Sequence, residues 1–169
     1  FNSDSAYAYI AKQVGFGPRI PNSPAQIKCK DWIVEKLKGY GWQVQIQEFT
    51  SFRYDGYKMK GYNIMASYQP QIAKRILLGA HWDARSIADK DSVDKNKPID
   101  AANDGASGVG VMLEIARLLS ETPKKPTVGV DLIFFDLEDH GEPHDFTGNP
   151  STTSWALGSQ HWATNMIPE

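Results

Sequence analysis

Apolar residues recur at helical spacing in two segments near the start of the chain. Residues 3–14 place an apolar surface on one helix face, made of Tyr7, Ile10, Ala11 and Val14. A second helix is predicted to begin after Ser23, which forms a capping-box pattern with Gln26 and precedes Pro24 at the first helical position. This helix would turn inward Cys29, Trp32, Ile33 and Leu37, and it would end at Gly39–Gly41.

Four later segments are predicted to be strands. Residues 42–47 alternate apolar side chains with glutamines, which is typical of an edge strand with one face in water. Residues 62–66 also alternate, as a second strand. The last two are the short apolar runs Arg75–Ala80 and Val128–Phe135, which indicate strands inside a sheet.

Two more helices and two long loops complete the pattern. Residues 105–120 carry apolar side chains at helical spacing, and a last helix is predicted to begin near Trp155. Residues 84–103 and 140–153 are polar and rich in turn-forming residues, so they are predicted to be loops. Loops of this length usually serve a site. The alternation of strands and helices predicts an α/β domain.

Composition narrows the class of protein. The chain has 169 residues, 41% hydrophobic and 22% charged, which fits a single globular domain over residues 1–169. A net charge of −2 and a pI of about 6.1 predict no nucleic-acid partner, and no stretch approaches the roughly 20 apolar residues that span a membrane. The single Cys29 excludes an internal disulfide and reads as a core residue. The residues given contain no signal peptide and begin with Phe1, so we expect a trimmed or processed start, which leaves export open.

Acidic clusters stand at the ends of the hydrophobic runs. His81 and Asp83 follow one predicted strand, Asp104 precedes a helix, and Glu138 and Asp139 follow another strand. The carboxyl ends of buried strands lie beside the ligand crevice of an α/β sheet, so these side chains should meet there. Each also has a simpler reading: a hydrogen-bonded structural histidine, a helix N-cap, and an acidic turn in water. Together they indicate a metal site.

The spacing within each cluster suggests a division of roles. Asp83 can point the same way as His81 from an extended strand end and fix its tautomer. The adjacent carboxylates of Glu138 and Asp139 repel each other unless a cation or a shared proton compensates. Because neighbouring side chains at a strand end diverge, one can bind metal while the other moves a proton. The other histidines, in the polar loop and the last helix, are assigned no site role: His140, His144 and His161.

These clusters, in this order, resemble the zinc aminopeptidase and glutaminyl cyclase family. The resemblance rests on His81-x-Asp83, on the run from Asn103 to Ala116, on the run from Leu132 to Asp139, and on Phe16–Pro21 and Ser154–Ala163, which are similar to animal-type glutaminyl cyclases and their bacterial relatives. It implies a three-layer α/β/α sandwich with a central mixed sheet and Zn²⁺ at the carboxyl ends of its strands. A periplasmic or secreted location is the corresponding expectation.

The resemblance also implies roles for individual residues. Asp104 and Asp139 would bind zinc, and Glu138 would be the general acid and base. Asp139 departs from the commoner pair of glutamates. His81 would bind a second zinc in an aminopeptidase and need not bind metal in a cyclase, so the zinc count is one or two. Asp83 and Asp136 would support the ligands from behind, Trp155 would line a substrate pocket, and the peptide after Asp104 would be cis.

The function implied is cyclisation of an N-terminal glutamine of a peptide or protein to pyroglutamate with release of ammonia. The alternative from the same residues is a zinc aminopeptidase, and a catalytically silent binding module is a third reading. Family members continue beyond the segments matched here, and a last zinc-binding histidine is expected outside these residues. We therefore expect the N-terminal portion of a catalytic domain, with an exposed apolar sheet edge.

Overall fold

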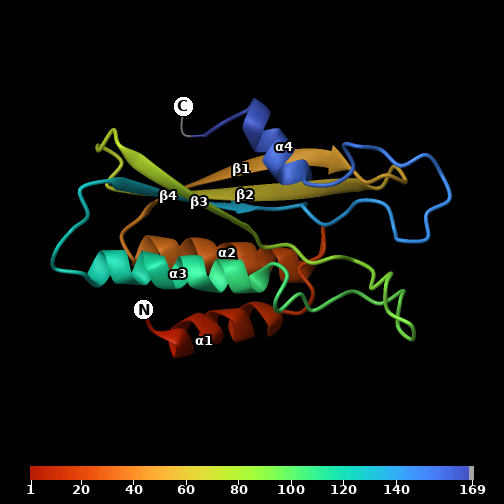
Figure 1. Cartoon of the computed structure of the whole chain (residues 1–169), viewed down its shortest axis with the longest axis horizontal. Coiled ribbons are helices and arrows are strands. Elements are labelled where there is room, and N and C mark those ends of the chain that lie inside the picture. The colour runs from red at the N-terminus through yellow and green to blue at the C-terminus, as the bar shows by residue number, and fades with distance from the viewer. Residues whose placement is uncertain (168–169) are drawn as a thin grey trace.

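The computed structural model describes residues 1–167 and contains a mixed sheet flanked by helices (Figure 1). The strands lie in the order β1-β2-β4-β3, with β1 and β4 antiparallel to β2 and with β3 parallel to β4. The elements in chain order are α1 (Ser3–Val14), α2 (Pro24–Gly39), β1 (Gln43–Phe52), β2 (Lys58–Tyr68), β3 (Arg75–His81), α3 (Ala106–Glu121), β4 (Gly129–Phe135) and α4 (Leu157–Thr164).

The helices form layers on both sides of this sheet. Figure 1 shows α2 and α3 against one face, α1 outside them, and α4 on the opposite face. This is the three-layer α/β/α arrangement with a mixed central sheet that the family resemblance implies. The parallel pairing sets His81 beside Phe135, and the Trp82 backbone N–H donates to the Phe135 carbonyl at 3.0 Å. The segments that follow β3 and β4 therefore leave the sheet side by side.

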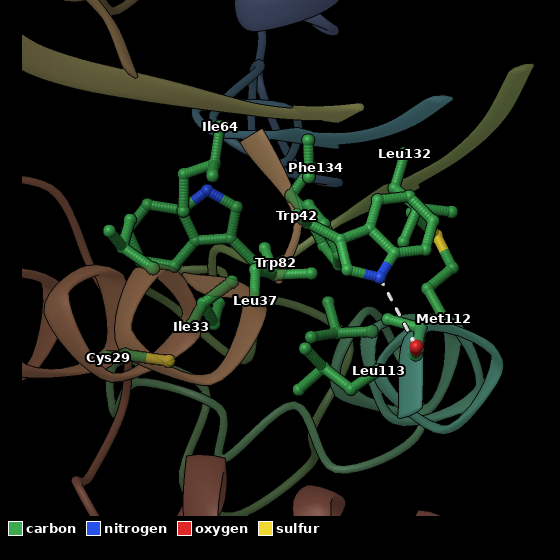
Figure 2. Close-up of a cluster of buried hydrophobic side chains, with 14 of the residues drawn as sticks. Cys29, Ile33, Leu37, Trp42, Ile64, Trp82, Met112, Leu113, Leu132 and Phe134 are labelled. Carbon is green, nitrogen blue, oxygen red and sulfur yellow. Dashed lines mark hydrogen bonds between the residues drawn. The ribbon is translucent and has the colours of Figure 1, made fainter. Parts of the chain in front are cut away.

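The core lies between the sheet and the α2–α3 layer (Figure 2). Trp82, directly after β3, is fully buried there and donates from its indole to the Tyr62 carbonyl at 3.2 Å. Trp42 donates from its indole to the Ala116 carbonyl of α3 at 3.2 Å, which is the bond drawn in Figure 2. Each indole thus buries a large apolar surface while its N–H keeps a partner. Cys29 is buried in the same cluster, as predicted.

The inward face of α1 differs from the prediction. Tyr7 is 73% exposed, whereas Ala6 and Gln13 are buried. The reason is that α1 packs on α3 and not on the sheet, at a point where a Cβ on Gly110 would lie only 2.8 Å from the Ala6 carbonyl oxygen. Such a close approach needs a glycine at position 110. Gln13 can be buried in the same contact because its side-chain amide donates to the Ala106 carbonyl at 3.0 Å.

The predicted capping box at α2 is only half formed. Ser23 accepts from the Gln26 backbone N–H at 3.1 Å, as expected. The Gln26 side chain turns into the protein instead of back to Ser23, and donates to Asp136 at 2.8 Å and to the Lys60 carbonyl at 3.0 Å. Its oxygen accepts from the Asn22 N–H at 2.8 Å, so the helix entry is still held.

One edge of the sheet lies where the sequence places it, whereas β3, which the sequence predicts inside the sheet, forms the other edge. β1 is one edge, but Gln47 on its expected wet face is buried and accepts from Asn63 at 3.0 Å, because α4 covers that face. β3 is the other edge, and Ile76 and Leu77 on it are about half exposed, which is an apolar edge of the expected kind. Among residues 1–167, no helix is long and apolar enough to cross a membrane.

Candidate active site

The end of β3 and the start of α3 meet at His81 and Asp104. The His81 Nε2 atom lies 2.6 Å from the Asp104 Oδ1 atom, which is a short hydrogen bond. Gly105 makes this approach possible, since a Cβ there would lie 2.4 Å from the His81 carbonyl oxygen and 2.6 Å from its ring. The Asp104–Gly105 peptide is cis, as the resemblance predicts.

Asp83 is buried behind this pair and connects three segments. Its carboxylate lies 3.3 Å from His81 Nδ1, accepts from the Asp139 backbone N–H at 3.1 Å, and lies 3.3 Å from His140 Nε2. Burial opposes its charge, but the contacts with His140 and His81 outweigh burial and lower its pKa. Asp83 therefore stays ionised and can orient His81, as the sequence suggests.

His81 is held between two carboxylates. Burial by itself would lower its pKa, but the hydrogen bonds and charges of Asp83 and Asp104 raise that pKa to about 9. Both ring nitrogens can then donate, one to each carboxylate. The imidazole fixes the position of Asp104 through this bridge.

Asp136 lies at the base of the site and faces away from the cleft. It is fully buried and accepts from the Gln26 side chain, from the Tyr62 N–H at 2.9 Å and from the Leu137 N–H at 2.9 Å. Burial raises its pKa well above the usual range, and the charge of Asp83 adds to this. Asp136 thus connects the end of β4 to α2 and β2. Its link to the rest of the site is the electrostatic repulsion between its carboxyl group and Asp83.

Glu138 is clamped by the start of α4. One of its oxygens accepts the Ser159 backbone N–H at 2.7 Å, and the other accepts the Ser159 hydroxyl at 3.0 Å. Burial raises the pKa of Glu138, although the bonds from Ser159 oppose the rise. Leu137, the residue before it, has φ of 57° in the left-handed region. Backbone strain of this kind is typical of functional sites, and here it turns Glu138 and Asp139 away from the strand direction.

Asp139 and Asp104 border the same cleft. This cleft has a volume of about 690 Å³ and is lined, among others, by Arg85, Asp89, Asp104, Asp139, Glu142 and Trp155. Burial raises the pKa of Asp139, the charge of Asp83 raises it further, and Asp104 adds to the repulsion. A cation between the two carboxylates would remove this penalty.

Trp155 forms one wall of the cleft and is 40% exposed. Its indole lies over Gly141, where an added Cβ would be 2.0 Å from the ring. The glycine is needed because only a bare backbone lets the ring approach so closely. Trp155 therefore lines the same cleft as both candidate metal ligands.

Three residues of the site were not recognised in the sequence. The sequence predicts that His140 is a loop residue without a site role, but it is 2% exposed and lies against Asp83. Ser159, which holds Glu138, and Arg85, which contacts the Asp139 carbonyl at 3.0 Å, carry no pattern of their own. Ser159 lies within the segment Ser154–Ala163 that supports the family resemblance, and that was the one available signal.

The donor set fits part of a zinc site. Asp104 and Asp139 supply carboxylate oxygens at one cleft, and an imidazole fixes one of them, which is chemistry that zinc accepts. Within residues 1–167, however, no group of three His, Cys, Asp or Glu side chains is close enough to hold a metal ion. A zinc ion here would take Asp104 and Asp139 and need a further ligand.

The mixed sheet between helix layers, with Asp104 and Asp139 at one cleft, matches the fold of zinc-exopeptidase-like proteins. Residues 63–169, more than half of the chain, match peptidase family M28, and the chain belongs to this family. It is 45% identical to the structure of Bacteroides thetaiotaomicron glutaminyl cyclase bound to N-acetylhistamine, with a TM-score of 0.94 over 98% of this chain and 57% of that one.

Two other solved structures are similar to the same degree. Tannerella forsythia glutaminyl cyclase is 48% identical, with a TM-score of 0.92 over 96% of this chain and 56% of that one. A Zn-dependent exopeptidase from Parabacteroides distasonis is 47% identical, with a TM-score of 0.94 over 99% of this chain and 57% of that one. The present chain thus spans a little over half the length of each relative.

Proposed function

We propose that this chain contributes part of the active-site wall of a zinc-dependent glutaminyl cyclase. The observation that carries the choice is the cleft lined by Asp104, Asp139 and Trp155, which sets an aromatic wall at the two candidate zinc ligands. Such a wall favours a compact, folded glutamine side chain over the extended peptide that a peptidase must bind past its metal.

In this proposal Asp104 and Asp139 hold the zinc, together with a ligand from outside the described residues. Zinc, when bound, supplies a Lewis acid that polarises the γ-amide carbonyl of the substrate glutamine. His81 and Asp83 keep Asp104 in place, and the Asp139 main chain is held by its bond to Asp83. Asp136 supports the same segment from the core.

Glu138 moves the proton. The α-amine nitrogen of the substrate forms a bond to the γ-carbonyl carbon, the bond from that carbon to the amide nitrogen breaks, and ammonia leaves. Glu138 accepts the proton from the attacking amine and delivers it to the departing nitrogen. Its raised pKa suits both transfers, since a carboxyl group titrating nearer to neutral pH can accept and return a proton. Ser159 keeps the carboxylate oriented throughout.

The cleft supports a compact substrate. A glutamine side chain folded toward its own amine is small, and Trp155 provides an aromatic wall beside Asp104 and Asp139. The substrate in this proposal is accordingly the N-terminus of a peptide or protein. A periplasmic or secreted location stays a prediction.

A zinc aminopeptidase is the second candidate. The observation in its favour is the 47% identity to a structure described as a Zn-dependent exopeptidase, which is as high as the identity to the cyclases. A catalytically silent binding module is disfavoured, because Asp104 and Asp139 line one cleft and Glu138 directly precedes Asp139.

A direct comparison of two substrates tests the proposal. The full-length protein, loaded with zinc, is assayed for ammonia release from a Gln-initiated peptide and for amine release from leucine anilide, and bound zinc is counted. The proposal expects ammonia release, little anilide cleavage and one zinc. Efficient anilide cleavage with two zincs per chain and His81 on one of them would establish the aminopeptidase instead.

A further inference from the structure

Arg85 is a buried cation with every donor in use. Its guanidinium makes two hydrogen bonds of 2.8 Å to Asp89, and others to the main-chain carbonyls of Asp139 at 3.0 Å, Gly141 at 3.4 Å and Glu142 at 3.2 Å. These bonds use all five N–H groups that an arginine possesses. The side chain is only 8% exposed. The orientation of this side chain is therefore fixed by hydrogen bonds to two segments, the loop of residues 84–103 and the segment that follows β4.

The Arg85 guanidinium lies over the indole ring of Trp155. The Arg85 Cζ atom is 4.7 Å from the centroid of the indole ring, within the range of a cation–π interaction. Glycine 141 leaves room for the ring on the same segment. Trp155 itself is 40% exposed, and its ring lies against both Arg85 and Gly141.

From this geometry we propose that Arg85 is a positioning residue that sets the specificity of the cleft by holding Trp155 as its wall. The identity of the substrate, an N-terminal glutamine, rests on the proposed function. The contact between Arg85 and Trp155 does not depend on that function. Lysine cannot replace Arg85, because an ammonium group lacks the planar fork and the flat stacking face. A purely structural role would predict a less stable protein with unchanged substrate preference.

The first test is a double-mutant cycle in the full-length protein. The variants are Arg85→Lys, Trp155→Ala and both together, with KM and kcat measured on a Gln-initiated peptide. Arg85→Lys should raise KM about two- to thirty-fold, the range that corresponds to a cation–π contact. In the Trp155→Ala background the same change should add little, because the group through which Arg85 acts is gone. Independent, multiplicative effects on KM would overturn the inference.

Arg53 offers a matched control. It pairs with both oxygens of Asp55 at 2.9 and 2.6 Å and lies over the rings of Tyr54 and Tyr57, yet it does not line the cleft. Arg53→Lys removes the same kinds of contact and should leave KM within about twofold. An equal rise of KM in both variants would indicate general loosening and contradict a specific role for Arg85.

The second test needs no activity and no substrate. Tryptophan is replaced by 5-fluorotryptophan, and the ¹⁹F resonance of Trp155 is identified by its loss in Trp155→Phe. In the parent this resonance should be displaced from that of the unfolded protein. Arg85→Lys should move it toward the unfolded value, while Arg53→Lys should not. A Trp155 resonance already at the unfolded position, or unmoved by Arg85→Lys, refutes the inference even if cyclisation occurs. Absence of cyclisation in the parent refutes the proposed function. The ¹⁹F measurement then still tests whether Arg85 positions Trp155.

Discussion

Replacement of Glu138 by glutamine separates proton transfer from metal binding. Glu138 accepts two hydrogen bonds from Ser159, one from the backbone N–H and one from the hydroxyl. In Glu138→Gln the side-chain oxygen can still accept the backbone N–H. The new amide can donate to the hydroxyl oxygen, since a serine hydroxyl both donates and accepts. The substituted side chain should therefore stay in place, and the fold should be unaffected.

The expected loss is the contribution of proton transfer alone. General acid–base catalysis by a positioned side chain contributes about 10²–10⁴-fold in rate, which is about 2.7–5.5 kcal/mol in the activation barrier. We expect kcat for ammonia release to fall by this factor, while KM, bound zinc and Tm stay close to the parent values. The measurements are ammonia release at saturating Gln-peptide, metal analysis of the purified protein and a thermal unfolding curve.

The adjacent acid provides the control. In Asp139→Asn the main chain remains held by its bonds to Asp83 and Arg85, so the change should act on the side chain alone. This variant should lose zinc. If Glu138→Gln loses zinc and Asp139→Asn keeps it, we have exchanged the roles of the two acids. If Glu138→Gln retains more than a tenth of the parent rate, Glu138 is not the proton carrier.

Three further predictions concern the surroundings of this acid. Trp155→Ala should raise KM for the Gln-peptide by about tenfold, or roughly 1.4 kcal/mol, because the cleft loses its aromatic wall while the half-exposed ring contributes little to stability; an unchanged KM would show that the substrate binds elsewhere. Ser159→Ala removes a bond that lowers the pKa of Glu138, so that pKa should rise further and the acid limb of the kcat/KM profile should move to higher pH; a shift toward lower pH would contradict the assignment. The hydrogen bonds from Arg85 lower the pKa of Asp89 to about 2, so the stability that they provide is present above about pH 4 and is lost as the pH falls toward 2. Asp89→Asn should therefore flatten the decline of Tm between these pH values. An unaltered decline of Tm would mean that other carboxylates cause it.

The hydrogen bond between His81 and Asp104 positions a candidate zinc ligand. His81 holds one oxygen of Asp104 and leaves the other oxygen for metal. Identity to two cyclases and to one exopeptidase is nearly equal, so counting bound zinc and comparing the two substrates separates the two activities better than overall similarity does.

The sequence by itself determined the elements and the place of the candidate site. Helical and strand periods are local properties of the chain, and they located α2, α3 and the four strands because each buried face repeats every 3.6 or 2 residues. The clusters around His81, Asp104 and Glu138 were expected to meet because strands in one sheet deliver their carboxyl ends to a common edge. The parallel register of β3 and β4 does place the segments after these strands side by side.

Only the tertiary structure decided which polar groups pair. Gln26 and Asp136 are 110 positions apart, and the partners of Arg85 on the second loop are 54 to 57 positions away. No local period encodes such pairs. His140 reads as a loop residue because its neighbours are polar, yet the fold buries it against Asp83. Local sequence specifies which face of an element is apolar, whereas the partner of a buried polar group depends on which distant segment the packing brings within hydrogen-bond reach.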